Sequence, residues 1–258
     1  MRDVASEAQL SALLAEKGFP GAAVAVYDSL PSTNDTLRAQ ALADAPDGSV
    51  VWAHAQSAGK GSRGRSFCSP AGGLYFSLLL RSYTDPMQIT CAAAVAVHEA
   101  IRSVLGIDPD IKWVNDLYKN GRKVCGILCE GITIGSTLSA VVLGVGINLA
   151  APTEGFPAEL SNIADALLPT PPAPEIAAGL LAEILSLLHA YLADPTRAYM
   201  QIYRTRNLVL GRRVRYHVGD IMCKATALEI TERGSLLLQC ENGSIREAFS
   251  GEISINMA

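Results

Sequence analysis

Residues 56–65, with the sequence Gln-Ser-Ala-Gly-Lys-Gly-Ser-Arg-Gly-Arg, restrict the fold of this chain more than any other segment. Their glycines have the G-x-G-x-x-G spacing of dinucleotide-binding loops, in which the loop opens directly into a helix. Here the loop is followed by the turn-forming residues 66–73 and then by the apolar run 74–80, which is typical of a strand. The sequence therefore argues against a dinucleotide fold and indicates a flexible loop between two strands.

Three cationic side chains, Lys60, Arg63 and Arg65, lie among these glycines. Glycine lets the backbone approach a ligand and turn its N–H groups inward, while Lys and Arg donate hydrogen bonds to phosphate or carboxylate oxygens. The net charge of the whole chain is −4, so we expect a local basic site rather than a general nucleic-acid surface. The loop is therefore either an anion-binding site or an ordinary solvated loop.

The composition predicts a globular protein in a reducing compartment. Of the 258 residues, 49% are apolar and 18% are charged, which argues against disorder. The six cysteines include no C-x-x-C pair and the four histidines are isolated, so we expect free thiols rather than metal ligands. The first residues lack a signal-peptide core, and we expect no apolar stretch that spans a bilayer without polar interruption. These features predict a cytoplasmic protein without a membrane partner.

The first half of the chain predicts alternating helices and strands. Only about twenty residues precede the first strand, too few for a helix-turn-helix domain, so we expect no DNA partner. Ser32 or Thr33 is expected to cap a helix, and the same hydroxyls could also hold a polar ligand group. Asp85 and Pro86 are expected to start a long helix that Gly106 ends. The predicted elements are helix 4–17, strand 22–27, helix 33–44, strand 49–55, strand 74–81 and helix 85–106.

Asn120-Gly121 predicts a two-residue β-hairpin. Its register would pair residue 119 with 122, 118 with 123, 117 with 124, and 116 with 125. Asp116 and Lys123 would then be diagonal neighbours on one face, about 7 Å apart at Cβ. They form either a structural salt bridge, which contributes little stability when exposed, or a functional polar cluster with Asn115.

The second half begins with a buried strand over 141–149, in which Gly144 and Gly146 leave one face without side chains. These glycines could pack against a helix or could form the floor of a pocket for a flat ring. A Pro-rich segment follows, with a short helix expected near 160–167. The remaining predicted elements are a long helix over 180–191, a helix over 194–205, and strands over 214–218, 221–230, 235–240 and 245–249, which predict a small appended β-barrel.

Jointly, these motifs resemble the biotin protein ligases, in the form without an N-terminal DNA-binding domain. The resemblance covers nearly the whole chain, and the matching segments have the family's order and spacing: residues 32–34, 56–65, 112–116, 123–128 and 144–148. It implies an α+β fold with a class II synthetase-like mixed β-sheet and packed helices, of the biotin/lipoate ligase type, over residues 1–208. It also implies an SH3-like β-barrel over residues 209–258.

The resemblance further implies a ligase that makes biotinyl-5′-AMP from biotin and ATP with Mg²⁺, and then transfers biotin to one lysine of a carboxyl carrier domain. The catalytic residues would be Lys123, Arg63 and Asp116, since cations must offset the repulsion between a carboxylate and the α-phosphate. Biotin would be bound by Ser32, Thr33, Asn34, Gln56, Gly59, Lys60, Ser62, Lys123 and Gly126. The nucleotide would be bound by Gly61, Arg63, Arg65, Lys112, Trp113, Asn115 and Asn148. The resemblance assigns no metal ligands.

Three residues depart from the family's usual pattern, since Lys60 replaces Arg, Phe67 replaces Trp and Val114 replaces Pro. Lysine lacks the bidentate guanidinium fork, so closure of the loop over the intermediate would be looser. Two other functions stay open: lipoate or octanoate transfer by a related ligase, and a non-catalytic biotin-binding regulator. The resemblance also allows a homodimer. The C-terminal barrel, with arginines at 212, 213 and 215, would either cap the main domain or help position ATP or the carrier.

Overall fold

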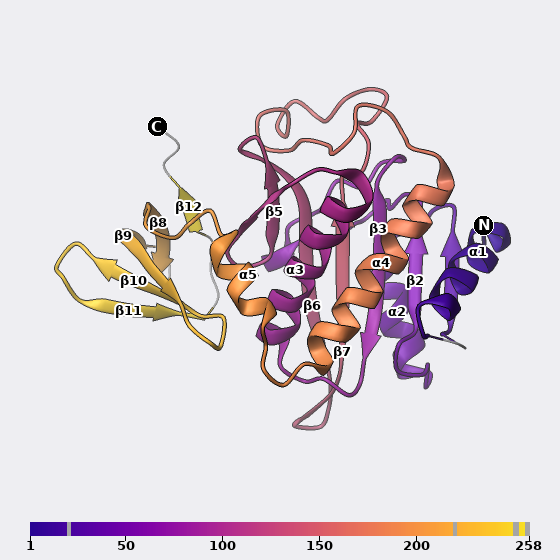
Figure 1. Ribbon diagram of the computed structural model, residues 1–258, viewed down its shortest axis with the longest axis horizontal. Helices are drawn as coiled ribbons and strands as arrows, with labels where there is room; N and C mark the ends of the chain where they lie inside the picture. The colour runs from indigo at the N-terminus through magenta and orange to yellow at the C-terminus, as the bar shows by residue number, and fades with distance from the viewer. Residues whose placement is uncertain (20–21, 219–220, 250–252, 256–258) are drawn as a thin grey trace.

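The computed structural model describes residues 1–19, 22–218, 221–249 and 253–255, so parts of the expected C-terminal domain lie outside the described residues. Its largest element is a seven-stranded mixed sheet with the order β1-β2-β3-β7-β6-β5-β4 (Figure 1). β1 and β2 pair in parallel and the other neighbours pair antiparallel, which confirms the predicted mixed sheet. The strands are β1 (Val24–Tyr27), β2 (Val50–Ala53), β3 (Leu74–Leu80), β4 (Asp110–Lys112), β5 (Asp116–Lys119), β6 (Arg122–Ile134) and β7 (Thr137–Ile147).

The two faces of this sheet are covered differently, because successive side chains of a strand point to opposite faces. Figure 1 shows α3 and α4 side by side across one face, where Leu74 and Phe76 of β3 join the main core. On the other face α2 packs against β2, β3 and β7, around Leu79 and Val142. The helices are α1 (Val4–Glu16), α2 (Thr33–Leu42), α3 (Pro86–Leu105), α4 (Pro174–Ala193) and α5 (Tyr199–Thr205).

The predicted caps of α2 and α3 are confirmed. Ser32 Oγ accepts a hydrogen bond from the backbone N–H of Asp35, which satisfies one of the free donors of the first turn of α2. Asp85 accepts from two backbone N–H groups at the start of α3. Gly106 ends this helix with φ of 67°, a left-handed conformation that glycine adopts without strain.

The helix predicted near 160–167 is wrong. These residues form a single turn, in which Ile163 and Ala164 donate to the carbonyl of Leu160, and the backbone that follows bonds to β6 instead of continuing a helix. Lys123 donates its backbone N–H to the carbonyl of Ile163 at 2.8 Å, and Asp165 donates to the carbonyl of Lys123 at 2.9 Å. The segment thus lies against the edge of β6 near Lys123.

Helix α4 is the one helix of the described residues that is long and apolar enough to cross a membrane by length and composition alone, although Glu183 and His189 interrupt it. It has 20 residues, and a window of 18 of them has a mean hydropathy of 1.8. In the structure α4 packs against α1 and α3, and it buries Leu180, Leu181, Ile184 and Leu188 in the core. An apolar core helix satisfies the same test.

The Asn120-Gly121 hairpin forms, but its register differs from the predicted one. Residue 119 pairs with 122 and 118 with 123, as predicted, whereas 117 pairs with 125 and 116 with 126. A β-bulge after Leu117 causes this shift, because it places one extra residue of β6 opposite β5. The two strands still bring Asp116 and Lys123 together.

The C-terminal residues form a five-stranded antiparallel sheet with the order β11-β10-β9-β8-β12. Among the described residues, no pairing joins β11 to β12, so the sheet is open and a closed barrel is not confirmed. Its buried side chains, including Val214 and Ala225, are continuous with the main core. The strands are β8 (Arg213–Val218), β9 (Ile221–Ile230), β10 (Leu236–Cys240), β11 (Ile245–Ala248) and β12 (Ile253–Ile255), the last of which was not predicted.

Candidate active site

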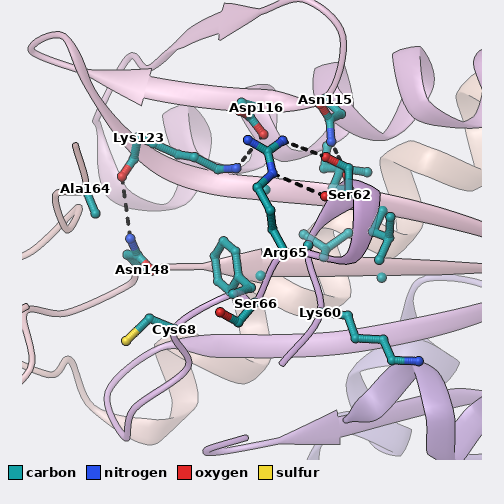
Figure 2. A pocket seen from close by; sticks show the side chains of 18 of the residues that line it. Lys60, Ser62, Arg65, Ser66, Cys68, Asn115, Asp116, Lys123, Asn148 and Ala164 are labelled. Atoms are coloured by element: carbon teal, nitrogen blue, oxygen red, sulfur yellow. Dashed lines mark hydrogen bonds and ion pairs between the residues drawn. The ribbon is translucent and has the colours of Figure 1, made fainter. Parts of the chain in front are cut away.

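A cavity of about 270 Å³ lies on the α2 side of the large sheet, between the ends of the central strands and the glycine-rich loop (Figure 2). Its floor is formed by β6 and β7, where Gly126 and Gly146 pair across the strands. A Cβ atom at position 146 would lie 2.6 Å from the ring of Phe67. A Cβ atom at position 144 would lie 2.2 Å from Asn34 Oδ1 of α2, so the predicted glycine face both packs against a helix and lines a cavity.

The wall of the cavity near α2 carries neutral hydrogen-bonding groups. Gln56 Oε1 accepts from the backbone N–H of Thr33 at 2.8 Å and lies 3.1 Å from Thr33 Oγ1. Gln56 Nε2 donates to Ser69 Oγ at 2.9 Å. Ser32 and Thr33 are almost fully buried, and both line the cavity. The start of α2 therefore forms part of the cavity wall.

Lys123 points along the floor toward Gly126, and its Nζ lies 2.6 Å from Asp116 Oδ1. This contact is an ion pair outside hydrogen-bond geometry, so Asp116 Oδ1 has no hydrogen-bond donor among the described residues although it is buried. Lys123 Nζ also lies 5.7 Å from the centre of the Phe67 ring, within reach of a cation–π interaction. The ammonium group is therefore held between one carboxylate and one aromatic face.

The glycine-rich loop folds into a tight turn over the cavity. Ser62–Gly64 forms a single 3₁₀ turn, in which Arg63 has a left-handed φ of 60° and is exposed. Arg65 donates from Nε to the carbonyl of Ser62 at 3.2 Å and from a terminal nitrogen to Ser62 Oγ at 3.0 Å. Figure 2 shows the Arg65 guanidinium on the side of the cavity where Asp116 and Asn115 lie.

Lys60 forms an ion pair with Asp35 in the first turn of α2. The hydrogen bond between Lys60 and Asp35 raises the pKa of Lys60. Burial lowers this pKa by a smaller amount, and the negative charge of Glu130 raises it further. Lys60 therefore links the loop to α2 as a cation throughout the neutral range.

Two asparagines border the end of the cavity near Lys123. Asn115 Nδ2 donates to the carbonyl of Ile127 at 2.5 Å, and Asn148 Nδ2 donates to the carbonyl of Asp165 at 2.9 Å. Trp113 is buried and its indole N–H donates to the carbonyl of Gly234 at 2.8 Å, which connects this end to the C-terminal sheet. Part of each side chain is thus committed to the fold.

The structure brings all but one of the predicted site residues to this cavity. The exception is Gly59, which does not line the cavity. A Cβ atom there would lie 2.5 Å from both the carbonyl of Phe67 and Ser69 Oγ, so glycine is needed for packing behind the wall. The predicted residues that line the cavity are Ser32, Thr33, Asn34, Gln56, Lys60, Gly61, Ser62, Arg63, Arg65, Lys112, Trp113, Asn115, Asp116, Lys123, Gly126 and Asn148.

Several lining residues were not predicted as site residues. Phe156, Leu160, Ile163 and Ala164 come from the irregular segment after β7, and Ile253 comes from β12. Their apolar side chains have no local pattern that separates a cavity lining from an ordinary core. Only the Pro-rich composition of the segment indicated a long loop, and long loops are often functional.

The described residues contain no group of three or more His, Cys, Asp or Glu side chains that could hold a metal ion. Five cationic residues line the cavity, Lys60, Arg63, Arg65, Lys112 and Lys123. Asp116 is the one carboxylate among the described lining residues. This charge balance suits an anionic ligand.

Two protein-family models match the chain. The biotin/lipoate A/B protein ligase family matches residues 26–148, and the biotin protein ligase C-terminal domain matches residues 209–255. The bifunctional ligase/repressor BirA of Bacillus subtilis is 32% identical over 237 residues, which are 89% of this chain and 73% of the relative. The biotin--[acetyl-CoA-carboxylase] ligase of Mycobacterium tuberculosis is 32% identical over 220 residues, which are 80% of this chain and 79% of the relative.

Solved structures give the same result. The biotin protein ligase of Aquifex aeolicus in complex with biotin and ATP superposes with a TM-score of 0.76 and 26% identity, over 92% of this chain and 99% of that chain. The fold therefore agrees with that of a solved biotin protein ligase over nearly the whole chain. The chain belongs to the biotin protein ligase family.

Proposed function

We propose that this protein activates biotin with ATP to biotinyl-5′-AMP, releases pyrophosphate, and transfers the biotinyl group to a lysine of a biotin carboxyl carrier domain. The carrying observation is the gradient of polarity along the cavity floor. The neutral amide of Asn34, next to Thr33 and Gln56 on the wall, lies at Gly144, while the Lys123 ammonium lies at Gly126, which pairs with Gly146, two residues or about 7 Å further along the strands. A ring with polar edges and a short acidic tail fits this gradient.

The cations of the cavity supply the chemistry that such a reaction needs. A carboxylate that attacks the α-phosphate is repelled by the phosphate oxygens, so charge compensation at the reacting atoms lowers the barrier. Lys123 would hold the carboxylate, and later the oxygens of the acyl phosphate. Arg63 and Arg65 on the loop would hold phosphate oxygens, and Asp116 keeps the Lys123 ammonium at the floor. Asn115 and Asn148 would border the adenine.

Mg²⁺ would enter this site with ATP. Magnesium is usually held by substrate phosphates and one or two carboxylates, and the cavity offers one, Asp116. When bound, the ion neutralises phosphate charge. The residues of the chain therefore fit a metal that is carried mainly by the nucleotide.

The fold also supports proposals about organisation. We place the boundary between the ligase domain and the C-terminal domain at residues 208 and 209, and we retain an SH3-like barrel for the C-terminal domain. The supporting features are the change from helices to strands at Gly211 and the five-stranded antiparallel sheet. A cytoplasmic location agrees with the six free cysteines.

A substrate assay tests the main proposal against its alternatives. Purified protein with ATP and Mg²⁺ should release pyrophosphate with biotin, and should then label an isolated carrier domain. Lipoate and octanoate should give no more than background, because their chains lack polar ring edges to match Thr33 and Gln56. Equal turnover with lipoate would favour the lipoate reading, and biotin binding without pyrophosphate release would favour a non-catalytic regulator.

Lys123→Ala should lower the rate of adenylate formation roughly 10²–10³-fold, since removal of one charge-compensating donor costs about 3–4 kcal/mol of transition-state stabilisation. Biotin-dependent pyrophosphate release measures this rate. Arg122→Ala is a matched control, because Arg122 lies on the same strand and pairs with Asp165 outside the cavity. If both variants lost the same activity, Lys123 would have a structural role only.

A further inference from the structure

The glycine-rich loop is a small hairpin whose two arms are bonded to each other. The backbone N–H of Phe67 donates to the carbonyl of Gly59 at 2.8 Å, and that of Gly61 donates to the carbonyl of Arg65 at 2.7 Å. These bonds lie on either side of Lys60, so its backbone has a fixed place in the hairpin. They hold the shape of the loop but not its distance from α2, which depends on contacts between the loop and the rest of the protein.

The side chain of Lys60 makes such a contact. Its ammonium forms an ion pair with the carboxylate of Asp35, in the first turn of α2. The negative charge of Glu130, on β6, also raises the pKa of Lys60. Asn34 Nδ2 donates to Glu130 Oε2 at 2.7 Å, which holds that carboxylate next to α2. The Lys60 charge is therefore compensated by carboxylates from α2 and β6.

The positions of these carboxylates separate Lys60 from the cation on the cavity floor. Asp35 and Glu130 do not line the cavity. Asp116, the partner of Lys123, does line it. Figure 2 shows the Lys60 side chain directed away from Lys123. The ammonium of Lys60 is thus engaged with the protein, where it can hold the loop.

The ion pair is exposed enough to have a limited but measurable effect. The side chains of Lys60 and Asp35 are 42% and 49% exposed. Exposed ion pairs contribute little to the stability of a whole protein, because water and salt screen them. A loop opens at a much smaller cost in free energy than the whole protein unfolds, so the same contribution can change the fraction of open loop several-fold. The effect of the pair should therefore appear in loop opening.

We propose that Asp35 is a positioning residue: by holding Lys60, with help from the charge of Glu130, it keeps the glycine-rich loop closed over the cavity before a ligand binds. The inference rests on the proposed function, in which the closed loop retains biotinyl-5′-AMP. In this assignment Lys60 assists ligand binding through the loop and not by contact with the ligand.

Limited digestion of the ligand-free protein with trypsin measures loop opening. Trypsin cleaves after Arg and Lys, and a peptide bond in a tight turn must open before a protease can cleave it. Arg63 is exposed at the tip of the loop and is kept in every variant, so mass spectrometry can follow cleavage after it. Asp35→Asn and Lys60→Gln should each speed this cleavage about two- to five-fold, the scale of one exposed ion pair.

Two further variants show whether the charges themselves are responsible. Lys60→Arg keeps the positive charge and should leave the cleavage rate unchanged. Glu130→Gln keeps an acceptor for Asn34 but removes the charge. Its effect should be smaller than that of Asp35→Asn, since the charge of Glu130 raises the pKa of Lys60 less than the hydrogen bond to Asp35 does.

A double-mutant cycle separates a loop-holding role from direct ligand contact. Asp35→Asn, Lys60→Gln and the double variant are compared by the rate at which they release biotinyl-5′-AMP. If the pair holds the loop, each single variant should release it about two- to five-fold faster and the double variant no faster than the singles, because either change breaks the same contact. If Lys60 bound the ligand itself, Lys60→Gln would speed release further in the Asp35→Asn protein, and the proposal would be wrong.

Lys17→Gln is the matched control. Lys17 Nζ lies 2.5 Å from Glu183 Oε2, in a partly exposed ion pair that joins the end of α1 to α4. Neither residue lines the cavity. This change should alter neither cleavage after Arg63 nor release of the intermediate. Urea unfolding of Asp35→Asn should match that of Lys17→Gln, because both lose one exposed ion pair.

The outcomes separate this inference from the proposed function. If the unmodified protein formed no biotinyl-5′-AMP, the proposed function would fail, and digestion of the ligand-free protein would still decide on the ion pair. If Asp35→Asn and Lys60→Gln were cleaved no faster than the unmodified protein, the inference would be wrong. It would also be wrong if Lys17→Gln were cleaved as fast as these two variants, because the effect would then come from a general loss of stability.

Discussion

Single residues of the glycine-rich loop have distinct tasks although they are neighbours in sequence. Arg65 bonds to Ser62 and fastens the turn, whereas Arg63 stands at its exposed tip with a left-handed backbone and lines the cavity. A cation at a loop tip can bind an anion only while the loop is closed. The turn is therefore the part of the site in which retention of the intermediate should be most sensitive to substitution.

Arg63→Ala should release biotinyl-5′-AMP roughly ten- to one-hundred-fold faster, because one charge-assisted hydrogen bond contributes about 1.5–3 kcal/mol. Loss of a radiolabelled intermediate from the protein on a filter measures this rate, and labelling of a bystander protein reports the leak. Arg63→Lys keeps the positive charge but lacks the bidentate guanidinium, so its release rate should lie between those of Arg63→Ala and the unmodified protein. Release at the unmodified rate would contradict closure of the loop through Arg63.

Among the elements, those with strong local signals were predicted from the sequence. The caps at Ser32 and Asp85, the Asn120-Gly121 hairpin and the glycine face of β7 each depend on residues close together in the chain. The bulge after Leu117 was missed, since it depends on how β5 meets the rest of the sheet. The contacts of Ser77 with Asn34, and of Asn34 with Glu130, were missed too, because these residues come from β3, α2 and β6 and meet only in the folded protein.

Helix α1 provides a pH-dependent test at this scale. Asp3 caps it, and hydrogen bonds from Ser6, followed by that from His54, lower the pKa of Asp3 from 3.8 to about 2. A carboxyl group with a lowered pKa stabilises the fold above its unfolded pKa, and this contribution is lost as the pH falls through the folded value. It should therefore be present at pH 5–7 and disappear between about 3.8 and about 2.

Asp3→Ala should thus lower the free energy of unfolding by about 1 kcal/mol near neutral pH, the usual value of an N-cap. Urea denaturation at a series of pH values measures the difference between the two proteins. The difference should shrink below pH 3.8. A difference that is constant down to pH 2 would show that the Asp3 charge contributes nothing.

At the scale of the whole molecule, the C-terminal sheet is part of the site as well as of the core. Ile253 lines the cavity, and Trp113 bonds to the turn at Gly234. Three of the arginines near the entry to this sheet form ion pairs with carboxylates: Arg204 with Glu232, Arg206 with Asp108 and Arg213 with Glu241. These pairs reduce the net positive charge that the arginines present to a partner.

The position with the strongest case for an electrostatic role is Arg215. It is exposed on β8 and pairs with Lys224, also exposed, directly across on β9. Like charges at opposite positions of two strands destabilise a sheet, so this pair has an electrostatic cost within the fold. An anionic partner would offset that cost, and a carrier domain with an acidic surface is such a partner.

Arg215→Glu should therefore raise the KM for carrier about three- to ten-fold at low salt, with biotin binding unchanged, because one rim charge acts mainly through encounter. The effect should fade as salt rises, since the Debye length falls from about 10 Å at 0.1 M to about 3 Å at 1 M. Arg233→Glu makes the same charge change in the turn after β9, beyond Ile230, which lies six residues or about 20 Å along the strand from Lys224, the partner of Arg215. Transfer kinetics at two salt concentrations decide the matter. If Arg215→Glu and Arg233→Glu raised the KM equally, the effect would come from net charge. If neither changed it, the C-terminal sheet would contribute to carrier transfer only through its packing around Ile253 and Trp113.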